Sequence, residues 1–280
     1  MENSSLTRTV QMNDGRSIPQ IGLGVFQMSD DDVQAHVLDA IEVGYRHFDT
    51  ARIYRNEEGL GRALASSGLA RDHFFVTTKL WNREQGTSSA RQALELSLSK
   101  LQLDTVDLYL IHWPAPARGR ALESWRTLIE LRDEGLIRSI GVSNFLPEHL
   151  DNLIEETGVV PAVNQVELHP AFQQPTLRGA HEDRGIVTQA WGPLGQARYE
   201  LAGIPIIRAL AEKHGRSPQA IALRWHIQCG TVVIPKTSQR ARMIDNAALE
   251  DIVLTDAEMA DIAAADRDER GGTHPIDGNW

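Results

Sequence analysis

The 280-residue sequence is poor in cysteine, in long apolar runs and in basic charge. Its one cysteine, Cys229, allows neither an internal disulfide nor a cysteine-based metal cage, which favours a reducing compartment. No apolar run reaches the roughly 18 residues that a membrane-spanning helix needs, and the N-terminal MENSSLTRTV lacks the apolar stretch of a signal peptide. The net charge of −10 disfavours nucleic acid and anionic membranes as partners. We therefore expect a free cytoplasmic protein.

The dinucleotide-binding fingerprint of doubly wound α/β sheets is also missing. Gly-x-Gly pairs occur at 22–24 and 59–61, but Gln27 and Leu64 stand where the third glycine should be. Neither pair is therefore a credible phosphate-binding loop of that fold.

What the sequence does contain is an alternation of short apolar runs with longer segments of helical period. Eight runs are predicted as strands: 17–26, 45–51, 74–81, 106–113, 137–145, 161–168, 185–192 and 231–237. Predicted helices between them include 31–43, 88–101, 121–134 and 147–156. The turn Asn13-Asp14-Gly15 predicts an N-terminal β-hairpin. Together these features predict an α/β protein, a (β/α)8 TIM barrel forming one domain over residues 1–280. The short C-terminal tail, 267–280, is polar and glycine-rich, and we expect it to be a mobile flap over the barrel mouth.

Polar side chains stand near the end of most predicted strands, where an ordinary core would place Val, Ile or Leu. They are Asp49, Lys79, His112, Ser143, Asn144, Gln165, Glu167, Gln189, Trp191 and Lys236. The carboxyl ends of barrel strands meet at one rim, so the pattern favours a reaction centre. Taken singly, Asp49 and Lys79 could be a structural ion pair, and His112 a core histidine. Tyr54, just beyond its strand, could be a packing aromatic.

If Asp49, Tyr54, Lys79 and His112 meet, they form a proton donor. An ammonium ~4 Å away favours phenolate by up to ~4 kcal/mol at an effective dielectric of ~20, about three pKa units. We therefore predict that Lys79 lowers the pKa of Tyr54. Asp49 would hold Lys79 charged, and His112 would orient the substrate oxygen.

None of these four groups is a hydride source, so reduction of a carbonyl requires a cofactor. A nicotinamide is the natural candidate. Trp191 offers a flat face for its ring, and Ser143, Asn144 and Gln165 could hold its carboxamide.

Six segments of the chain resemble those of the aldo-keto reductases in order and spacing: GYRHFDTARIY, TTKLW, LIHWP, GVSNF, NQVELHP and IPKTSQRARMIDN. The resemblance covers nearly the whole chain. It implies a catalytic tetrad of Asp49, Tyr54, Lys79 and His112 in an oxidoreductase. Such an enzyme reduces aldehydes or ketones to alcohols by hydride transfer from NADPH, with Tyr54 as the proton donor. AWGPLG and the short tail look most like the bacterial 2,5-diketo-D-gluconate reductase branch, which implies a keto-sugar or another small carbonyl as substrate.

The resemblance also implies the cofactor-binding residues. They are Ser143, Asn144, Gln165, Trp191, Gly192, Pro193, Leu194, Lys236, Thr237, Ser238, Arg242 and Asn246. Lys236, Thr237 and Arg242 are implied to contact the 2′-phosphate of NADP⁺. Two cations and a hydroxyl suit a phosphate, so NADH is expected to bind more weakly than NADPH.

Several positions depart from the family's usual pattern. Trp191 stands where many members have tyrosine, and Asp245 where glutamate is common. Gln239 and Ala241 vary the phosphate-binding segment, so the preference for NADPH is expected to be less strict than usual.

The substrate pocket is expected to be aromatic. Phe26, Trp81 and Trp113 would form its walls, and a brief tail would leave the mouth open to many substrates.

Two other functions compete with the reductase. The first is a metal-dependent hydrolase with Asp49, His112, Glu167 and His169 as ligands, since barrels host this chemistry too. No His-x-His follows an early strand, and Glu167 with His169 makes only one plausible ligand pair, so we expect no metal. The second is a nicotinamide-binding sensor without turnover. The complete tetrad disfavours this alternative, because a sensor has no need of the catalytic residues. We expect the enzyme to be a monomer.

His226 and Cys229 could share one face of a helix. Two potential ligands fall short of a metal site, so this pair does not change the expectation.

Overall fold

The computed structural model describes residues 5–280, and its centre is a sheet of eight parallel strands. The strands are β3 (Leu23–Gly24), β4 (His47–Asp49), β5 (Phe75–Leu80), β6 (Val106–Ile111), β7 (Ile137–Ser143), β8 (Val163–Glu167), β9 (Val187–Trp191) and β10 (Val232–Val233). They are neighbours in this order. A parallel bridge between Ile21 and Val233 joins the two edges, and the Gly22 N–H donates to the Val233 carbonyl at 2.8 Å. The sheet therefore closes, and the predicted (β/α)8 barrel is confirmed.

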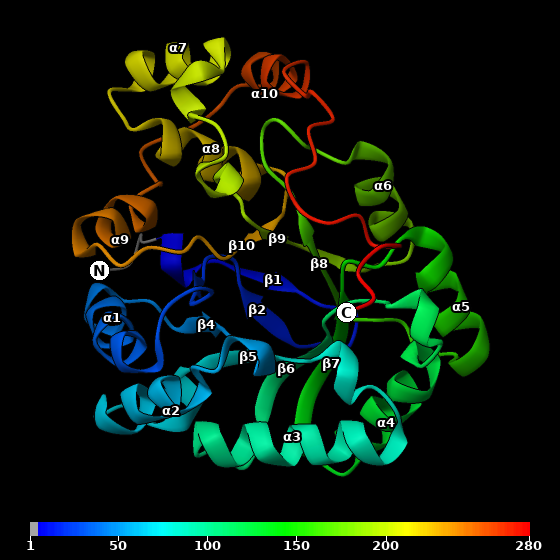
Figure 1. Cartoon of the computed structure of the whole chain (residues 1–280). Helices are drawn as coiled ribbons and strands as arrows, with labels where there is room; N and C mark the ends of the chain where they lie inside the picture. The colour runs from blue at the N-terminus through cyan, green and yellow to red at the C-terminus, as the bar shows by residue number, and fades with distance from the viewer. Residues whose placement is uncertain (1–4) are drawn as a thin grey trace.

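The helices form a ring around these strands (Figure 1). They are α1 (Asp30–Val43), α2 (Glu57–Ser66), α3 (Thr87–Leu101), α4 (Ala121–Asp133), α5 (Pro147–Thr157), α6 (Pro175–Asp183), α7 (Pro205–His214), α8 (Pro218–Gln228), α9 (Arg240–Ala247) and α10 (Asp256–Ala263). Local chemistry sets the ends of α1. The Ser29 side chain accepts from the Asp32 N–H at 3.1 Å, and Gly44 ends the helix in the left-handed region at φ 117°.

The first predicted strand, 17–26, is wrong as a single element. Ser17–Pro19 is β2, which pairs antiparallel with β1 (Thr9–Gln11) in the predicted hairpin, and only Leu23–Gly24 joins the barrel. The reason is burial, because Ile18 on β2 is as fully buried as a barrel residue. Ile18 packs with Leu108 and Val163, so the hairpin closes the bottom of the barrel. Its buried apolar residue made the hairpin strand look like part of the barrel strand that follows it in sequence.

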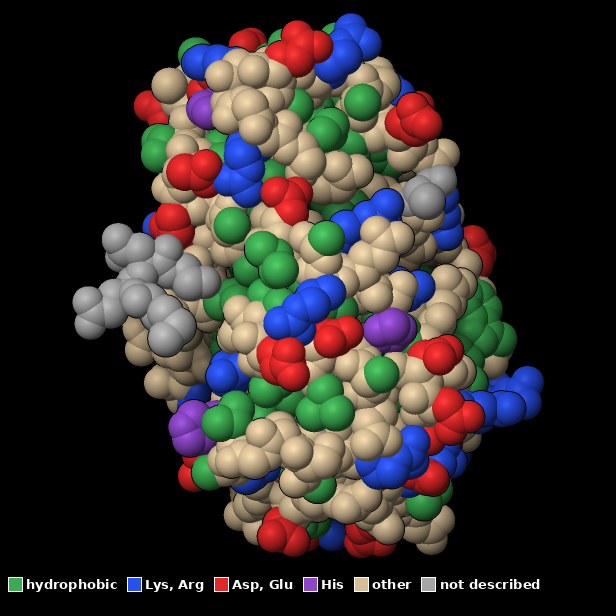
Figure 2. Space-filling model, turned by 90° about the vertical axis from the view of Figure 1, so that its left-hand side faces the viewer, with side chains coloured by type: hydrophobic (Ala, Val, Ile, Leu, Met, Phe, Trp, Pro, Cys, Tyr) green, Lys and Arg blue, Asp and Glu red, His purple; other side chains and the backbone are tan. Residues whose placement is uncertain are grey.

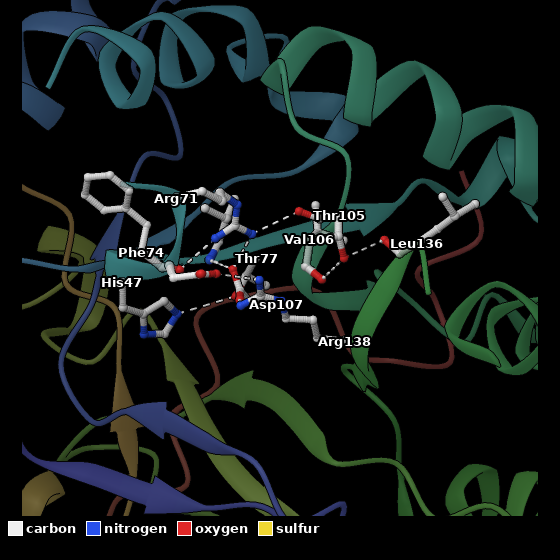
Figure 3. A network of polar contacts seen from close by, with 11 residues as sticks. His47, Arg71, Phe74, Thr77, Thr105, Val106, Asp107, Leu136 and Arg138 are labelled. Atoms are coloured by element: carbon white, nitrogen blue, oxygen red, sulfur yellow. Dashed lines mark hydrogen bonds and ion pairs between the residues drawn. The ribbon is translucent and has the colours of Figure 1, made fainter. Parts of the chain in front are cut away.

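A polar network holds together the amino-terminal ends of β5, β6 and β7, at the end of the barrel opposite the polar rim (Figure 3). Its centre is Asp107, whose side chain is 5% exposed. Asp107 accepts from Arg71 at 2.6 Å, from Arg138 at 3.0 Å and from the Val76 N–H at 2.8 Å. This carboxylate therefore satisfies a buried backbone donor as well as two cations.

Asp107→Ala is expected to lower the free energy of unfolding by about 2–3 kcal/mol, because the buried Val76 N–H loses its acceptor. The two arginines add less, since both are partly exposed and can turn to water. Urea denaturation measures the loss. Asp72→Ala is the control, because Asp72 also pairs with Arg138, at 2.8 Å, but is 83% exposed. Equal stability of the two variants would contradict the role given to Asp107.

The outer surface on the side of α1 and α9 mixes both signs of charge. Figure 2 shows acidic and basic side chains interleaved on this face, with no continuous basic patch. Arg240 of α9, for example, lies 2.9 Å from Glu42 of α1. None of the helices within residues 5–280 is long and apolar enough to cross a membrane.

Candidate active site

The carboxyl ends of adjacent strands bring together the four residues predicted as a tetrad. Asp49 ends β4, Lys79 lies in β5, His112 follows β6, and Tyr54 ends the 3-10 turn η2 (Arg52–Tyr54). The Lys79 ammonium donates to Asp49 Oδ1 at 2.5 Å and lies 5.1 Å from the centre of the Tyr54 ring. The Tyr54 and His112 rings are 5.7 Å apart. A phenol, an ammonium, a carboxylate and an imidazole therefore share one small volume.

The pKa of Tyr54 is raised well above its ordinary value, first by burial and then by the negative charge of Asp49. The prediction that Lys79 lowers this pKa is wrong. The Lys79 charge is already matched by Asp49, and its ammonium also donates to the Thr50 carbonyl at 2.8 Å. Little net positive charge is left to stabilise a phenolate, so burial determines the direction in which the pKa of Tyr54 shifts. Tyr54 is a neutral phenol that keeps its proton until an acceptor develops negative charge beside it.

His112 is also neutral. Burial and then the Lys79 charge lower its pKa well below the ordinary value of histidine. A neutral imidazole can donate a hydrogen bond to a substrate oxygen, but it supplies no full positive charge.

These two shifts predict the pH dependence of kcat. His112 becomes charged only below its lowered pKa, and Tyr54 loses its proton only above its raised pKa. Carbonyl reduction needs the protonated phenol, so it is expected to be flat between about pH 6 and 9. Alcohol oxidation needs the phenolate, so it is expected to rise with pH over the same range. Steady-state kinetics in both directions checks this, and an inflection of the reduction rate near pH 6.5 would contradict a neutral His112.

Three side chains predicted to hold a carboxamide meet next to the tetrad. Asn144 is held in the left-handed region at φ 63° and donates through Nδ2 to the His112 carbonyl and to Ser143 Oγ, both at 3.0 Å. Trp191 Nε1 donates to Asn144 Oδ1 at 2.8 Å. Gln165 donates through Nε2 to Asp49 Oδ2 at 2.7 Å.

Gln165 and Asn144 each keep an acceptor site that no group of the described chain fills. Gln165 Oε1 has no donor among residues 5–280, and Asn144 Oδ1 keeps a second lone pair. Two acceptors suit the two N–H bonds of a carboxamide, so the residues present fit a nicotinamide.

The segment around the start of α9 suits a phosphate. Lys236 and Arg242 are exposed, and within the described part of the chain the ion pairs of this helix's basic residues are those of Arg240. Thr237 Oγ1 accepts from the Gln239 N–H at 3.1 Å. Among residues 5–280 no side chain caps α9, so its first N–H groups are open to an anion.

The other predicted cofactor residues lie beside these groups. Gly192, Pro193 and Leu194 directly follow β9, Ser238 is exposed next to Thr237, and Asn246 is buried in α9.

His226 has a structural partner, because its Nε2 lies 3.2 Å from the Pro193 carbonyl. Burial lowers the pKa of His226 to about 3.

The substrate mouth is more enclosed than predicted. The Phe26 ring lies 4.9 Å from Tyr54, and the Trp81 ring lies 5.4 Å from His112. Trp280, which sequence analysis did not select, lies 5.5 Å from Trp113 and 6.4 Å from Trp81. The sequence signal for this role was a terminal tryptophan after a glycine-rich polar segment, since such a segment can bring an aromatic side chain back to the barrel mouth.

The tail that carries Trp280 runs back across the barrel from α10 (Figure 1). The backbone N–H groups of Gly271 and Gly272 each donate to the Glu167 carboxylate at 2.7 Å. Asn82 donates to the Gly278 carbonyl at 2.9 Å. The expectation of an open mouth is therefore wrong, because hydrogen bonds at both ends of the tail hold it over the pocket.

Two residues of the alternative metal site, Glu167 and His169, already have partners within the protein. Glu167 accepts from the tail and from His169 Nε2 at 3.2 Å, and His169 Nδ1 lies 3.0 Å from the Tyr199 hydroxyl. Within residues 5–280 no three His, Cys, Asp or Glu side chains gather as a metal site requires.

Comparison with known proteins gives consistent matches. A family model described as the aldo/keto reductase family matches residues 20–267. An aldo-keto reductase of Mycolicibacterium smegmatis is 48% identical over 266 residues, covering 95% of this chain and 96% of the relative. Methylglyoxal reductase DkgA of Salmonella typhimurium is 46% identical, with the same coverage of 95% and 96%.

Solved structures agree. An aldo/keto reductase from Brucella melitensis superimposes with a TM-score of 0.91 at 48% identity, covering 95% of this chain and 100% of that one. A Gox0644 variant in complex with NADPH superimposes with a TM-score of 0.91 at 45% identity, covering 96% and 97%.

Proposed function

This chain belongs to the aldo/keto reductase family, and we propose that the residues at its barrel rim reduce small aldehydes and ketones to alcohols. The chain is an NAD(P)H-dependent oxidoreductase, and its cofactor is NADPH. One observation carries the assignment of the reaction to this site. A buried Lys79–Asp49 pair, the Tyr54 phenol and the His112 imidazole converge beside the aromatic rings of Phe26 and Trp81.

When bound, the nicotinamide supplies a hydride to the carbonyl carbon. Tyr54 donates its phenolic proton to the carbonyl oxygen as negative charge develops there. His112 donates a hydrogen bond to the same oxygen and holds it next to the phenol. Lys79, fixed by Asp49, lies 5.1 Å from the centre of the Tyr54 ring, and this ion pair positions the phenol for the transfer.

The pocket favours a small substrate. Trp81, Trp113 and Trp280 narrow the mouth, and these aromatic faces suit the apolar side of a short carbonyl compound. Methylglyoxal reductases among the relatives support a small dicarbonyl, and a keto-sugar such as a diketogluconate belongs to the same chemical class.

A substrate panel followed by NADPH absorbance tests the proposal. Methylglyoxal, a diketogluconate and short aldehydes are expected to be reduced faster than bulky aromatic ketones. NADPH binding without turnover of any carbonyl would instead favour a sensor, and stoichiometric zinc or manganese in the purified protein would favour a hydrolase.

We also propose that the protein acts as a one-domain monomer in the cytoplasm. The single cysteine and the mixed surface charge of Figure 2 support this view. Light scattering of the purified protein tests the oligomeric state.

A further inference from the structure

Gln189 is a buried polar residue that the proposed mechanism does not use. It lies in β9, pairs in register with Gln165 of β8 and is completely buried inside the barrel. We propose that Gln189 is a positioning residue, which fixes the amide of Gln165 and thereby aims the acceptor for the nicotinamide carboxamide. This inference rests on the proposed function, because it requires Gln165 to bind that carboxamide.

The hydrogen bonds of Gln165 determine which way its amide faces. Its Nε2 donates to Asp49 Oδ2 at 2.7 Å and to Gln189 Oε1 at 3.1 Å. Both partners are acceptors, so the nitrogen must point toward them and Oε1 must point away. With Asp49 alone, the amide could still turn about a single hydrogen bond. The second bond, to Gln189, fixes the plane of the amide and hence the direction of Oε1.

Stability does not explain a glutamine at position 189. Its Nε2 is buried and has no partner among residues 5–280. Turning the amide over would set the NH2 group of Gln189 against that of Gln165, so the unpaired donor follows from the contact with Gln165. A buried donor without a partner lowers stability. An apolar side chain at position 189 would remove this donor but leave the second N–H of Gln165 without an acceptor, so the two effects offset each other and stability gives no preference for glutamine.

The neighbouring residue on the same strand shows the contrast. Thr188 faces the outside of the barrel, where its hydroxyl lies 2.9 Å from His181 Nδ1. The side chain of Gln165 takes no part in this hydrogen bond, since His181 contacts Asn164 through its other ring nitrogen, at 2.8 Å. Thr188→Val is therefore a matched control for the loss of one polar contact in β9.

The test uses Gln189→Met, NADPH affinity from the quenching of tryptophan fluorescence, and thermal unfolding. The variant is expected to bind NADPH about three- to tenfold more weakly, the range for loss of one ordinary hydrogen bond. Its unfolding temperature is expected to stay close to that of the native chain, because the variant removes one unpaired donor and leaves another on Gln165. Thr188→Val is expected to change NADPH affinity by less than about twofold. Equal effects of the two variants would overturn the inference.

A second variant tests the chemistry of the contact and replaces the first if Gln189→Met does not fold. Gln189→Glu keeps an acceptor oxygen, and a carboxyl buried next to Asp49 stays neutral because burial and like charge raise its pKa. At about pH 6 it is expected to bind NADPH within about twofold of the native chain. A loss as large as that of Gln189→Met would show that the acceptor is not what matters.

Gln165→Met separates this inference from the proposed function. If Gln165→Met leaves NADPH affinity unchanged, the carboxamide assignment itself is wrong. If Gln165→Met weakens binding but Gln189→Met behaves like the control, only the role of Gln189 is wrong. In the double variant, Gln189→Met is expected to add less than about a twofold loss, because it acts through Gln165. Additive losses would overturn the inference.

Discussion

Replacing Tyr54 by phenylalanine is expected to lower kcat for carbonyl reduction by about 10²- to 10⁴-fold, the usual contribution of a general acid. NADPH affinity is expected to stay within about twofold, because the hydroxyl acts on the substrate oxygen in the transition state. The structure supplies the physical reason. Burial keeps Tyr54 protonated, and its ring lies 5.7 Å from that of His112, the residue that would hold the substrate oxygen.

Single-turnover kinetics with saturating NADPH measures this loss, and fluorescence titration measures cofactor binding. Tyr109→Phe is the matched control. Tyr109 is also fully buried, and its hydroxyl has no partner among residues 5–280, so the control removes an idle hydroxyl. Turnover by Tyr54→Phe close to that of the control would show that the acid is misassigned.

Replacing both Lys236 and Arg242 by methionine is expected to have the largest effect on cofactor choice. Both cations are exposed and without ion-pair partners in residues 5–280, next to the uncapped start of α9. Each charge-assisted contact to a phosphate contributes about 1.5–3 kcal/mol, so NADPH affinity is expected to fall by more than about a hundredfold. NADH lacks the 2′-phosphate, so its affinity is expected to change less than about threefold.

Fluorescence titration with each cofactor measures the two changes on one protein. Arg240→Met is the control, because Arg240 lies in the same helix but is already paired with Asp39 and Glu42 of α1. It is expected to leave the ratio of NADPH to NADH affinity unchanged. Equal losses of NADPH and NADH in the Lys236/Arg242 variant would refute a contact with the 2′-phosphate.

The fold was predictable because it follows from local patterns. The runs that became β5 to β9 are short, apolar and separated by helical segments, and a parallel sheet is the usual consequence of this order. Asp49 and Lys79 could be placed at one rim because parallel strands end on the same side. The split of 17–26 was not predictable, since the apolar run gives no sign that Ile18 lies under the barrel rather than in its wall.

The sequence by itself determined the barrel, the family and the residue types at the rim, because these depend on period, order and motif. Only the tertiary structure decided how the charges balance. Asp49 matches the Lys79 charge, so the lysine does not lower the pKa of Tyr54 as predicted, and burial raises it. Only the tertiary structure brought the tail to Glu167, a carboxylate 104 residues from Gly271 in sequence. Contacts of this kind depend on where the chain places distant groups in space, and no local pattern encodes that distance.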